Sequence, residues 1–488
     1  MFNRAVLASV AIATGVAAQP YNEPLRPQYH FSPAKNWTND PNGLVYYKGE
    51  YHLFYQHNPF GDKWGHMSWG HAVSRDMVHW QHLPVALAEE NGIMIFSGSV
   101  VVDPNTSGLC VAGAPDCLVA IYTGHTETKQ AQHIAVSNDR GRTWTKFTGN
   151  PVLDLNLKDF RDPKVFWHGP GKYWVMVVSL PDQHKVRLYK SANLKSWELM
   201  SEFGPAGSTA GNWECPDLFS LPVEGKPGER KWMLSVNIMP GGPQGGSANQ
   251  YFVGDFDGVR FTNANGANVT LWADYGADFY ASTSFSDIPA MDGRRMWIGW
   301  LSNWLYANDE PTSPWRGLQS FPRVLSYRET PEGLRLAQRP IVELKRLRRS
   351  PIHLTNVTLD EANRKLAAFH GQSYEIEVNG AAEVHLLKDA QHETAVGLAD
   401  TVHIDRLHSG NIDFNKDFAK PHPSVAARNR RIRIFVDHSV VEVFANDGMT
   451  VLTDRVFPPE SASGLALSGA PSGRVTITVW KIASAWTK

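Results

Sequence analysis

Three acidic residues of the chain lie in short segments rich in aromatic residues, glycine and proline. They are Asp40 in Trp37-Thr38-Asn39-Asp40-Pro41-Asn42-Gly43, Asp162 in Phe160-Arg161-Asp162-Pro163, and Glu214 in Trp213-Glu214-Cys215-Pro216-Asp217. Cleavage of a glycosidic bond needs one ionised carboxylate to receive the sugar cation and one protonated carboxyl group to release the leaving oxygen. Aromatic rings supply a surface on which a sugar can stack. The three segments in one chain therefore predict a glycosidase.

Each acid taken alone has a plainer interpretation. An aspartate before Pro-Asn-Gly is commonly a turn residue, and an arginine next to an aspartate commonly forms an ion pair. In an enzyme that retains configuration, the two reacting carboxyl groups lie about 5–5.5 Å apart. Because Asp40 and Glu214 are far apart in the chain, they can meet only in a fold that gathers distant segments around one site.

The charge of the chain is nearly balanced, with 47 lysine and arginine residues against 48 aspartate and glutamate residues. This balance argues against a nucleic-acid partner and favours an uncharged one. The 488 residues are too many for one ordinary core and are expected to form two domains. The many aromatic residues suit a large all-β core as well as sugar stacking.

The N-terminus has the pattern of a secretory signal. Arg4 precedes an apolar run over residues 5–16, and the small residues Val16-Ala17-Ala18 precede Gln19. Residues 1–18 are therefore predicted to be a signal peptide. The run is too short to span a bilayer, and no later segment reaches ~18 uninterrupted apolar residues. We expect a secreted, extracellular protein without a membrane anchor.

Export makes the three cysteines interpretable, since an oxidising compartment allows disulfides. Cys110 and Cys117 flank a short segment with glycine and proline and could close a local loop. That pairing leaves Cys215 free beside Glu214. We interpret Cys215 as a buried neighbour of the acid and not as a nucleophile.

Four sequons for N-glycosylation are present, as expected of an exported chain. Asn36 carries one of them, but a glycan there would block the segment around Asp40, so we expect it to stay bare. The candidate glycosylation sites are Asn105, Asn268 and Asn356.

Short runs of valine, tyrosine, phenylalanine and tryptophan alternate with polar turns, which predicts an all-β protein. A weak repeat supports this: residues 69–80 are echoed by residues 133–144, 186–197 and 251–261. Each copy is a strand, a polar turn and an aromatic residue. The spacing of the copies is typical of four-stranded propeller blades with long loops. We predict a five-bladed β-propeller over residues 19–340.

The residue pattern of the chain changes after Pro340. The basic run Lys345-Arg346-Leu347-Arg348-Arg349 is interpreted as a solvated linker over residues 341–352, with a processing site as the alternative. Residues 431–437 and 440–444 alternate apolar and polar side chains with period two, as strands of a two-layer sandwich do. Residues 353–488 are therefore predicted to form a C-terminal β-sandwich.

The chain resembles glycoside hydrolase family 32, the β-fructofuranosidases that include invertases, exo-inulinases and levanases. The resemblance runs from about Tyr29 to the C-terminus. It rests on the three acidic segments together with Phe96-Ser97-Gly98-Ser99 and Asp278-Phe279-Tyr280-Ala281, all in the order of the family. The segments 160–167 and 278–315 look most similar to those of exo-acting levanases and exo-inulinases.

The resemblance implies roles for the matching residues. Asp40 would be the nucleophile, Glu214 the general acid and base, and Asp162 the stabiliser of the transition state through hydrogen bonds to fructose hydroxyls. It further implies a fructose pocket, with two aromatic residues nearer the leaving group. These substrate residues are Asn39, Gln56, Trp64, Phe96, Ser97, Arg161 and Trp304, with Tyr280 and Trp315 on the leaving-group side. For Trp64, Trp304 and Trp315 the alternative is packing between blades.

The expected substrate is a fructan or sucrose, and the mechanism needs no metal and no cofactor. Histidines such as His66 and His71 lack a companion motif with metal-ligand spacing. Alternatives are an invertase-like or transfructosylating enzyme and a non-catalytic fructan-binding protein; the last would be expected to have lost an acid. A sialidase is favoured only by the turn at residues 137–144. The oligomeric state, monomer or homodimer, stays open.

Overall fold

The structure, a computed structural model, describes residues 21–486, and the predicted signal peptide lies outside them. Almost all of the regular structure consists of strands; the single α-helix of the described part is α1(Leu359–Leu366). None of the helices in residues 21–486 has the length and apolar character needed to cross a membrane. The fold class is therefore mostly β, as the sequence predicts.

The described strands before residue 341 form five sheets, and neighbouring strands within each are antiparallel apart from β21. The sheets consist of β1(Asn36–Tyr47), β2(Glu50–Asn58), β3(Ser68–Ser74), β4(Trp80–Leu87) and β21(Trp315–Arg316); of β5(Met94–Asp103), β6(Cys117–His125), β7(Gln130–Ser137), β8(Thr145–Lys146) and β9(Leu153–Leu157); of β10(Arg161–His168), β11(Tyr173–Leu180), β12(Lys185–Ser191) and β13(Glu198–Phe203); of β14(Asn212–Pro222), β15(Arg230–Met239), β16(Ala248–Phe256), β17(Phe261–Asn263) and β18(Leu271–Trp272); and of β19(Tyr280–Ser284), β20(Arg295–Trp300), β22(Arg323–Thr330) and β23(Gly333–Pro340).

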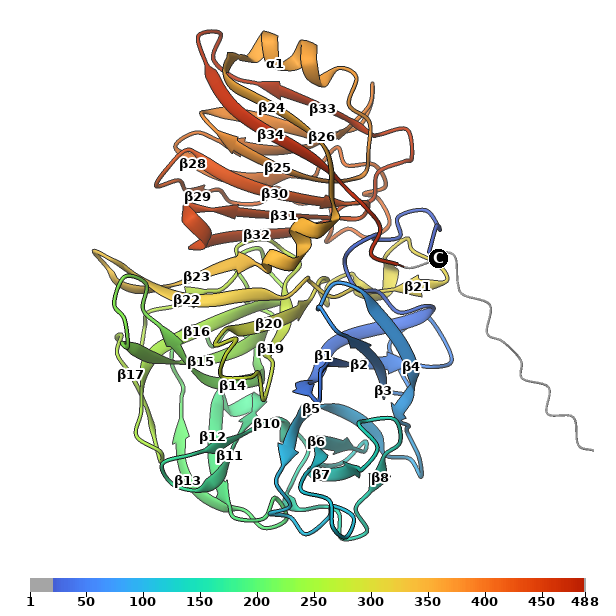
Figure 1. Cartoon of the computed structure of the whole chain (residues 1–488), viewed down its shortest axis with the longest axis vertical. Helices are drawn as coiled ribbons and strands as arrows, with labels where there is room; N and C mark the ends of the chain where they lie inside the picture. The colour runs from blue at the N-terminus through green and yellow to red at the C-terminus, as the bar shows by residue number, and fades with distance from the viewer. Residues whose placement is uncertain (1–20, 487–488) are drawn as a thin grey trace, which may run out of the picture.

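The first strands of these sheets surround a common centre, and the later strands lie farther out (Figure 1). Contacts run from β1 to β5, from β5 to β10, from β10 to β14, from β14 to β19 and from β19 back to β1. The ring is also tied by β21, which pairs in parallel with the start of β1. The N-terminal unit is thus arranged like a propeller. Each inner strand runs along the central axis, with one end at each of the two mouths of that axis.

The weak sequence repeat corresponds to one turn that occurs in four of the sheets. An aspartate or asparagine begins each turn, and its side-chain Oδ1 accepts hydrogen bonds from backbone N–H groups two to four residues later. In such Asx turns the side-chain oxygen takes the place of a backbone acceptor and holds a tight reversal of the chain. The aromatic residue that closes each repeat then starts or directly precedes the outer strand. The turn residues are Asp76, Asp139, Asn193 and Asp257.

The C-terminal unit consists of two antiparallel sheets. In β30, Ile432, Ile434 and Val436 are buried in the shared core, because alternate residues of a strand face the same side. This is a sandwich, as predicted. The sheets are β24(Arg348–Thr358), β34(Arg474–Ile482), β25(Ser373–Asn379), β30(Arg431–Asp437), β31(Val440–Ala445) and β32(Thr450–Arg455), and β29(Val425–Ala426), β28(Thr401–Asp405), β27(Thr394–Leu398), β26(Ala382–Lys388) and β33(Gly464–Ser468).

The segment interpreted as a solvated linker, residues 341–352, is ordered and partly buried. Its 3-10 helix η3(Val342–Leu347) buries Leu344 and Leu347. Strand β24 already begins at Arg348, whose guanidinium lies 3.8 Å from the Trp480 ring and pairs with buried Glu375 at 2.5 Å. The sandwich sheet therefore starts before residue 353. The basic run concealed the start of this strand, because the charge of Arg348 is paired and its guanidinium lies over an aromatic ring of the sheet, while Lys345, Arg346 and Arg349 are exposed.

Candidate active site

The inner strands break their pairing register at the same level of the propeller-like unit. A break of this kind, a β-bulge, turns side chains away from the regular alternation and often marks a functional site. Asp162 and Cys215 also adopt left-handed φ angles of 67° and 45°, which cost energy for residues other than glycine. The breaks lie between Thr38 and Pro41, Ile95 and Gly98, Arg161 and Lys164, Glu214 and Asp217, and Tyr280 and Thr283.

These bulges surround a pocket of about 360 Å³ at one mouth of the axis. The three predicted acids lie in it together, and so do all the predicted substrate residues except Tyr280 and Trp315. The lining residues are Asn39, Asp40, Gln56, Trp64, Met67, Phe96, Ser97, His125, Gln130, Asp159, Arg161, Asp162, Glu214, Met239 and Trp304.

Asp40 sits among hydrogen-bond donors on the floor of this pocket. Ser97 Oγ donates to Asp40 Oδ2 at 2.6 Å, and Asn39 Nδ2 donates to Oδ1 at 3.0 Å. Burial raises the pKa of Asp40, the two donors lower it, and the charge of Glu214 raises it further; the net direction is upward. Two donors that favour the ionised form of Asp40 are thus present, but burial outweighs them.

Asp162 is held by the bulge of the neighbouring strand. The Cys215 N–H donates to Asp162 Oδ2 at 2.8 Å, and the Asp162 N–H donates to Thr123 Oγ1 at 3.0 Å. Burial raises the pKa of Asp162 to about 7 against the opposing charge of Arg161, and the charges of Glu214 and Asp40 add to the increase. The carboxylates of this pocket therefore repel one another.

Cys215 lies between two of the acids. Its sulfur is 3.7 Å from Asp40 Oδ2 and 3.5 Å from Asp162 Oδ2. Burial and then the charges of Asp162 and Asp40 raise the pKa of this free thiol well above its ordinary value. Since attack by a cysteine requires a thiolate, Cys215 has the properties of a buried neighbour and not of a nucleophile.

Arg161 is the cation that holds Glu214. Its Nε and Nη2 donate to Glu214 Oε1 at 3.1 and 2.7 Å, and its Nη1 donates to Asp159 Oδ1 at 2.6 Å. The other oxygen of Glu214, Oε2, accepts a hydrogen bond from the Tyr280 hydroxyl. Arg161, predicted to contact substrate, is thus largely occupied with carboxylates. Tyr280 is buried and reaches the pocket through its contact with Glu214.

Trp315 does not lie in the pocket, and its prediction as a substrate residue is wrong. Its side chain is fully buried in the core of the propeller-like unit, with the Arg26 guanidinium 4.6 Å above the ring. The reason is the pairing of β21 with β1, which places Trp315 opposite Asn36 and turns the indole inward. Of the two interpretations left open by the sequence, blade packing applies.

Two tryptophans do form walls of the pocket. Trp64 is 41% exposed and meets Phe96 edge to face at 6.1 Å. Trp304 is half-buried and packs on Trp37 and Trp300 at 5.8 and 4.8 Å. A fixed ring at the side of a pocket with one free face is the geometry that sugar stacking requires.

Five lining residues were not predicted from the sequence. Asp159 could have been found, because it lies two residues before Arg161 and shares its guanidinium. His125 stacks on Phe96 at 4.1 Å and is hydrogen-bonded to Gln130 at 3.1 Å; both lie at strand ends outside any recognisable motif. The remaining two are Met67 and Met239.

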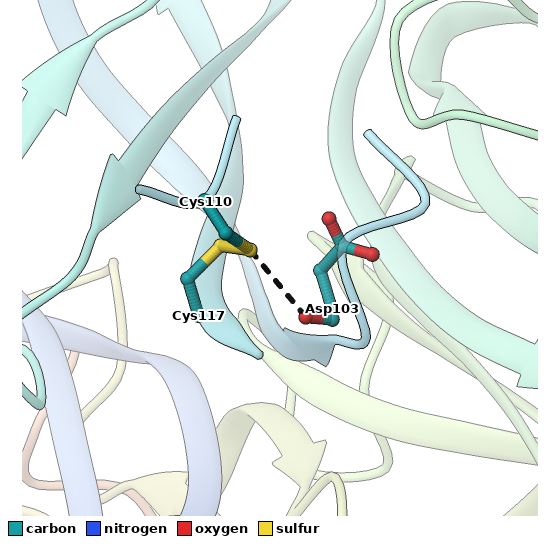
Figure 2. A group of neighbouring side chains, drawn as sticks. All are labelled: Asp103, Cys110 and Cys117. Atoms are coloured by element: carbon teal, nitrogen blue, oxygen red, sulfur yellow. Dashed lines mark hydrogen bonds between the residues drawn. A yellow bond between two sulfur atoms is a disulfide. The ribbon is translucent and has the colours of Figure 1, made fainter. Parts of the chain in front are cut away.

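Cys110 and Cys117 form a disulfide with a Cα–Cα distance of 5.4 Å. Within residues 21–486, these sulfurs and Asp103 are the one group of three or more candidate ligands close enough to share a metal ion (Figure 2). Two sulfurs bonded to each other offer no thiolate. The Asp103 carboxylate is also occupied, since it accepts hydrogen bonds from Thr106 and Ser107. The disulfide and the hydrogen bonds of Asp103 therefore stabilise this loop.

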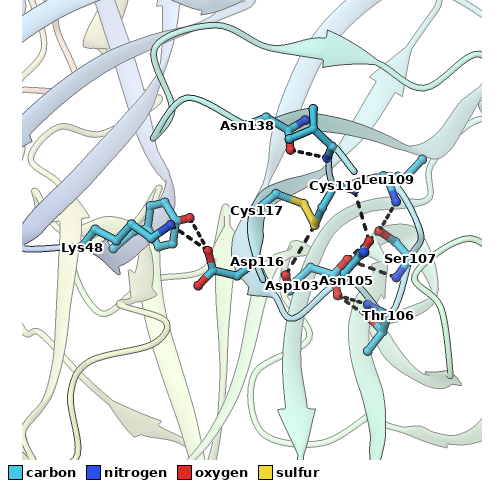
Figure 3. The surroundings of a disulfide bond; sticks show 12 residues. Lys48, Asp103, Asn105, Thr106, Ser107, Leu109, Cys110, Asp116, Cys117 and Asn138 are labelled. Atoms are coloured by element: carbon cyan, nitrogen blue, oxygen red, sulfur yellow. Dashed lines mark hydrogen bonds and ion pairs between the residues drawn. A yellow bond between two sulfur atoms is a disulfide. The ribbon is translucent and has the colours of Figure 1, made fainter. Parts of the chain in front are cut away.

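The candidate glycosylation site Asn105 lies in the same loop, where its Oδ1 accepts a hydrogen bond from the Cys110 N–H at 3.3 Å (Figure 3). Asn105 is exposed, as are Asn268 and Asn356. Asn36 differs from them: it is half-buried, and its Nδ2 donates to the Pro59 carbonyl oxygen at 2.7 Å. The amide that would carry a glycan at Asn36 is already occupied.

Comparison with known proteins places this geometry in a family. The model of the glycosyl hydrolases family 32 N-terminal domain matches residues 30–340, and that of the family 32 C-terminal domain matches residues 343–482. A levanase of Bacillus subtilis is 50% identical, over 93% of this chain and 69% of the levanase. The extracellular exo-inulinase of Aspergillus awamori is 38% identical over 98% of both chains.

Solved structures agree with the sequence matches. The crystal structure of exo-inulinase from Aspergillus awamori has a TM-score of 0.88 and covers 96% of this chain and all of that one, at 36% identity. A fructofuranosidase from Schwanniomyces occidentalis, complexed with fructose, has a TM-score of 0.86 over 96% of this chain and 99% of that one, at 32% identity. From residue 30 to residue 482, through both of its units, the chain belongs to glycoside hydrolase family 32.

Proposed function

We propose that the protein is a retaining β-fructofuranosidase that releases terminal fructose from fructans such as inulin and levan, and also cleaves sucrose. One observation carries this proposal: Asp40, Asp162 and Glu214, from three different inner strands, line a single pocket with aromatic walls. The names of its relatives, levanase and exo-inulinase, indicate the substrate class.

In the first step, an Asp40 oxygen bonds to the anomeric carbon of the fructosyl unit while the glycosidic oxygen leaves with a proton from Glu214. In the second step, water attacks the same carbon, gives its proton to Glu214 and releases Asp40. Two displacements at one carbon retain its configuration. Asp162, fixed by the Cys215 N–H, accepts hydrogen bonds from the sugar hydroxyls and stabilises the cationic transition state.

The surroundings of the acids favour these roles. Ser97 and Asn39 donate to Asp40 and so support its ionised form. Arg161 and Tyr280 hold the two oxygens of Glu214 from different directions, which fixes the carboxyl group for proton transfer. Asp162 adds a third carboxylate close to Asp40 and Glu214. Such a group favours the reaction where positive charge develops, as it does on the sugar ring in the transition state.

The architecture proposed for this chemistry is a five-bladed propeller, in which each of the five sheets is one blade. A pocket of about 360 Å³ is small for a polymer groove, since ligand pockets range from about 300 to 1,000 Å³. Its walls at Trp64 and Trp304 favour removal of chain ends over internal cleavage. Secretion is proposed from the N-terminal signal pattern, with glycans at the exposed sequons.

The decisive experiment is incubation with sucrose, inulin and levan, followed by chromatography of the products over time. Free fructose as the first product from all three is the expected result. Early oligosaccharides without free fructose would contradict action at chain ends. Oligosaccharides longer than the substrate, formed in moderate sucrose, would instead indicate a transfructosylase. A lack of reaction with all three, despite stoichiometric binding, would leave the non-catalytic binding protein as the better description.

A further inference from the structure

A second pocket lies at the opposite mouth of the propeller axis. Its volume of about 340 Å³ is close to that of the catalytic pocket. Strands β5, β10 and β14 contribute residues to both pockets, and β10 carries Asp162 at one end and Trp167 near the other. With a rise of about 3.3 Å per residue, these two residues are roughly 15 Å apart. A single sugar unit cannot touch both pockets.

The floor of this pocket is polar but neutral. Lys164 is buried, and its Nζ lies 3.5 Å from Asp217 Oδ2 and 3.2 Å from Thr283 Oγ1. Asp217 Oδ2 also accepts a hydrogen bond from the Ser284 N–H at 2.7 Å. Because the two charges are next to each other, the floor exerts no net attraction on an anion or a cation.

Two further charged residues of the pocket also balance each other. Arg295 donates from Nη1 to the Phe285 carbonyl oxygen at 2.9 Å, and its guanidinium lies 5.2 Å from the Phe219 ring. Asp287 is exposed and accepts one hydrogen bond, from the Val102 N–H at 3.0 Å. A guanidinium has five N–H donors and a carboxylate about four acceptor positions. Both residues therefore keep capacity for the hydroxyl groups of a neutral ligand.

An aromatic surface completes the pocket. Trp167 is 42% exposed, nearly the same fraction as the 41% of Trp64 in the catalytic pocket. It meets Trp174 edge to face at 5.1 Å, which fixes the ring and leaves a large part of it open. The pocket thus combines an exposed tryptophan with a guanidinium donor, Arg295, and a carboxylate acceptor, Asp287. Such a combination recognises sugar rings, by stacking and by hydrogen bonds to hydroxyls.

We propose that this pocket is a second saccharide-binding site, which holds a neutral fructosyl unit of a polymer outside the catalytic pocket. The inference rests on the proposed function for the identity of the sugar. A chain retained here keeps its ends, or those of neighbouring chains, near the enzyme, so the benefit is confined to polymers and is absent for sucrose.

The test compares Trp167→Ala and Asp287→Asn with wild type, and Leu199→Ala serves as the control because Leu199 is 48% exposed on β13 and lines neither pocket. For both test variants we expect kcat/KM for sucrose to stay within about twofold, and KM for levan or inulin to rise about three- to tenfold, the scale of a modest gain in effective concentration. Polymer and sucrose kinetics that stay unchanged in both variants would overturn the proposal.

Binding is measured separately, by electrophoresis in gels that contain levan or inulin, with every variant placed in a Glu214→Gln background so that the polymer survives. Retardation that weakens in Trp167→Ala and Asp287→Asn but not in Leu199→Ala supports the site. Equal retardation of all variants refutes it, even if hydrolysis is intact. Failure of the wild type to hydrolyse sucrose would count against the proposed function alone, because this binding comparison does not depend on turnover.

Discussion

Two groups of buried carboxylates lie in this molecule, and they are balanced differently. In the candidate active-site pocket, three carboxylates, Asp40, Asp162 and Glu214, lie with one arginine, Arg161, which pairs directly with Glu214. In the layer between the propeller-like unit and the sandwich, each of the acids Glu310, Asp278, Asp274 and Glu442 pairs directly with a buried arginine. There Arg455 pairs with Glu310 at 2.7 Å, Arg406 with Asp278 at 2.7 Å, and Arg323 with both Asp274 and Glu442 at 2.9 Å.

Asp437, in the same layer, shows most clearly what a full set of partners does, whereas burial still raises the pKa of Asp274 and of Glu310 despite their arginines. Its carboxylate accepts hydrogen bonds from the backbone N–H groups of Gln28, Tyr29 and His30, and from the His30 ring at 2.9 Å. Burial raises the pKa of Asp437, but the hydrogen bond and charge of His30 outweigh it, and the net pKa is lowered. The pKa of Asp162 moves in the opposite direction, to about 7.

The contrast teaches that burial alone does not make a carboxylate reactive. A buried acid with a full set of partners joins two parts of a fold, and removing a partner is costly. A buried acid with too few partners has a perturbed pKa and is available for chemistry. Asp162 and Asp437 should therefore respond oppositely to the same substitution, and this difference can be tested.

The largest expected effect is on catalysis. Asp40→Asn or Glu214→Gln removes a group that reacts in the transition state, so kcat with sucrose should fall by roughly a thousandfold or more. In Asp40→Asn the unfolding midpoint should stay the same or rise, because burial and the charge of Glu214 disfavour the ionised form of Asp40. Steady-state kinetics and thermal unfolding provide both readouts, with Asp255→Asn as the control because that side chain is 66% exposed. A loss of less than tenfold would contradict the assigned roles.

Stability should fall most when a matched pair is broken. Arg455→Met leaves Glu310 charged and fully buried, at an expected cost of about 3–5 kcal/mol in the free energy of unfolding. Urea denaturation measures this cost, and Arg364→Met on the exposed face of α1 is the control.

The double variant Arg455→Met, Glu310→Gln sharpens the test, because neutralising the orphaned acid should restore part of the lost stability. If the double variant were no more stable than Arg455→Met alone, the loss would come from packing and not from the unpaired charge.

Asp162→Asn should behave in the opposite way. Because the folded-state pKa of Asp162 is about 7 and its ordinary value is 3.8, this residue costs stability progressively as the pH rises from about 4 to about 7. The variant should therefore match wild type near pH 4 and be more stable at pH 8, by on the order of a few kcal/mol.

Thermal unfolding at pH 4, 5 and 8 measures the effect, with Asp437→Asn as the partner experiment. The lowered pKa of Asp437 means that its ionised form stabilises the protein above about pH 4, so its removal should destabilise the protein at pH 8. Two variants that shift in the same direction at pH 8 would show that the two groups are not distinct.

The sequence was sufficient to predict that the three acids share one site, because local motifs record them. The bulged segments around Asp40, Asp162 and Glu214 need particular neighbours, such as the proline that follows within two residues of each acid. The propeller-like unit was predictable for a similar reason, since its Asx turns, as at Asp76 and Asn193, recur in the chain.

Residues whose surroundings come from distant segments were not predictable. Trp315 and Trp304 are the same residue type in neighbouring sequence, yet pairing with β1 buries the first while the second lines the pocket. His125 enters the site because β6 ends there, and no motif marks it. The start of β24 was missed because its polar residues mimic a loop. Even Asp278, read as part of a family motif, has its partners Arg406 and Tyr306 only through tertiary structure.

The smallest expected effect concerns the hydroxyl group that donates to Asp40, the proposed nucleophile. Ser97→Ala removes a hydrogen bond to the charged form of Asp40, whose pKa burial already raises. The pKa of Asp40 should rise further, so that less of it is ionised at acidic pH, and the acidic limb of the kcat/KM profile should move up by about one unit. Ser97→Thr keeps the hydroxyl and should restore the profile. Ser99→Ala, on the same strand but bonded to the Pro163 carbonyl oxygen, should leave the limb unchanged. An unshifted limb in Ser97→Ala with only a higher KM would assign Ser97 to substrate contact. The pKa of Asp40 would then be set by burial, the Asn39 and Cys215 hydrogen bonds and the charge of Glu214.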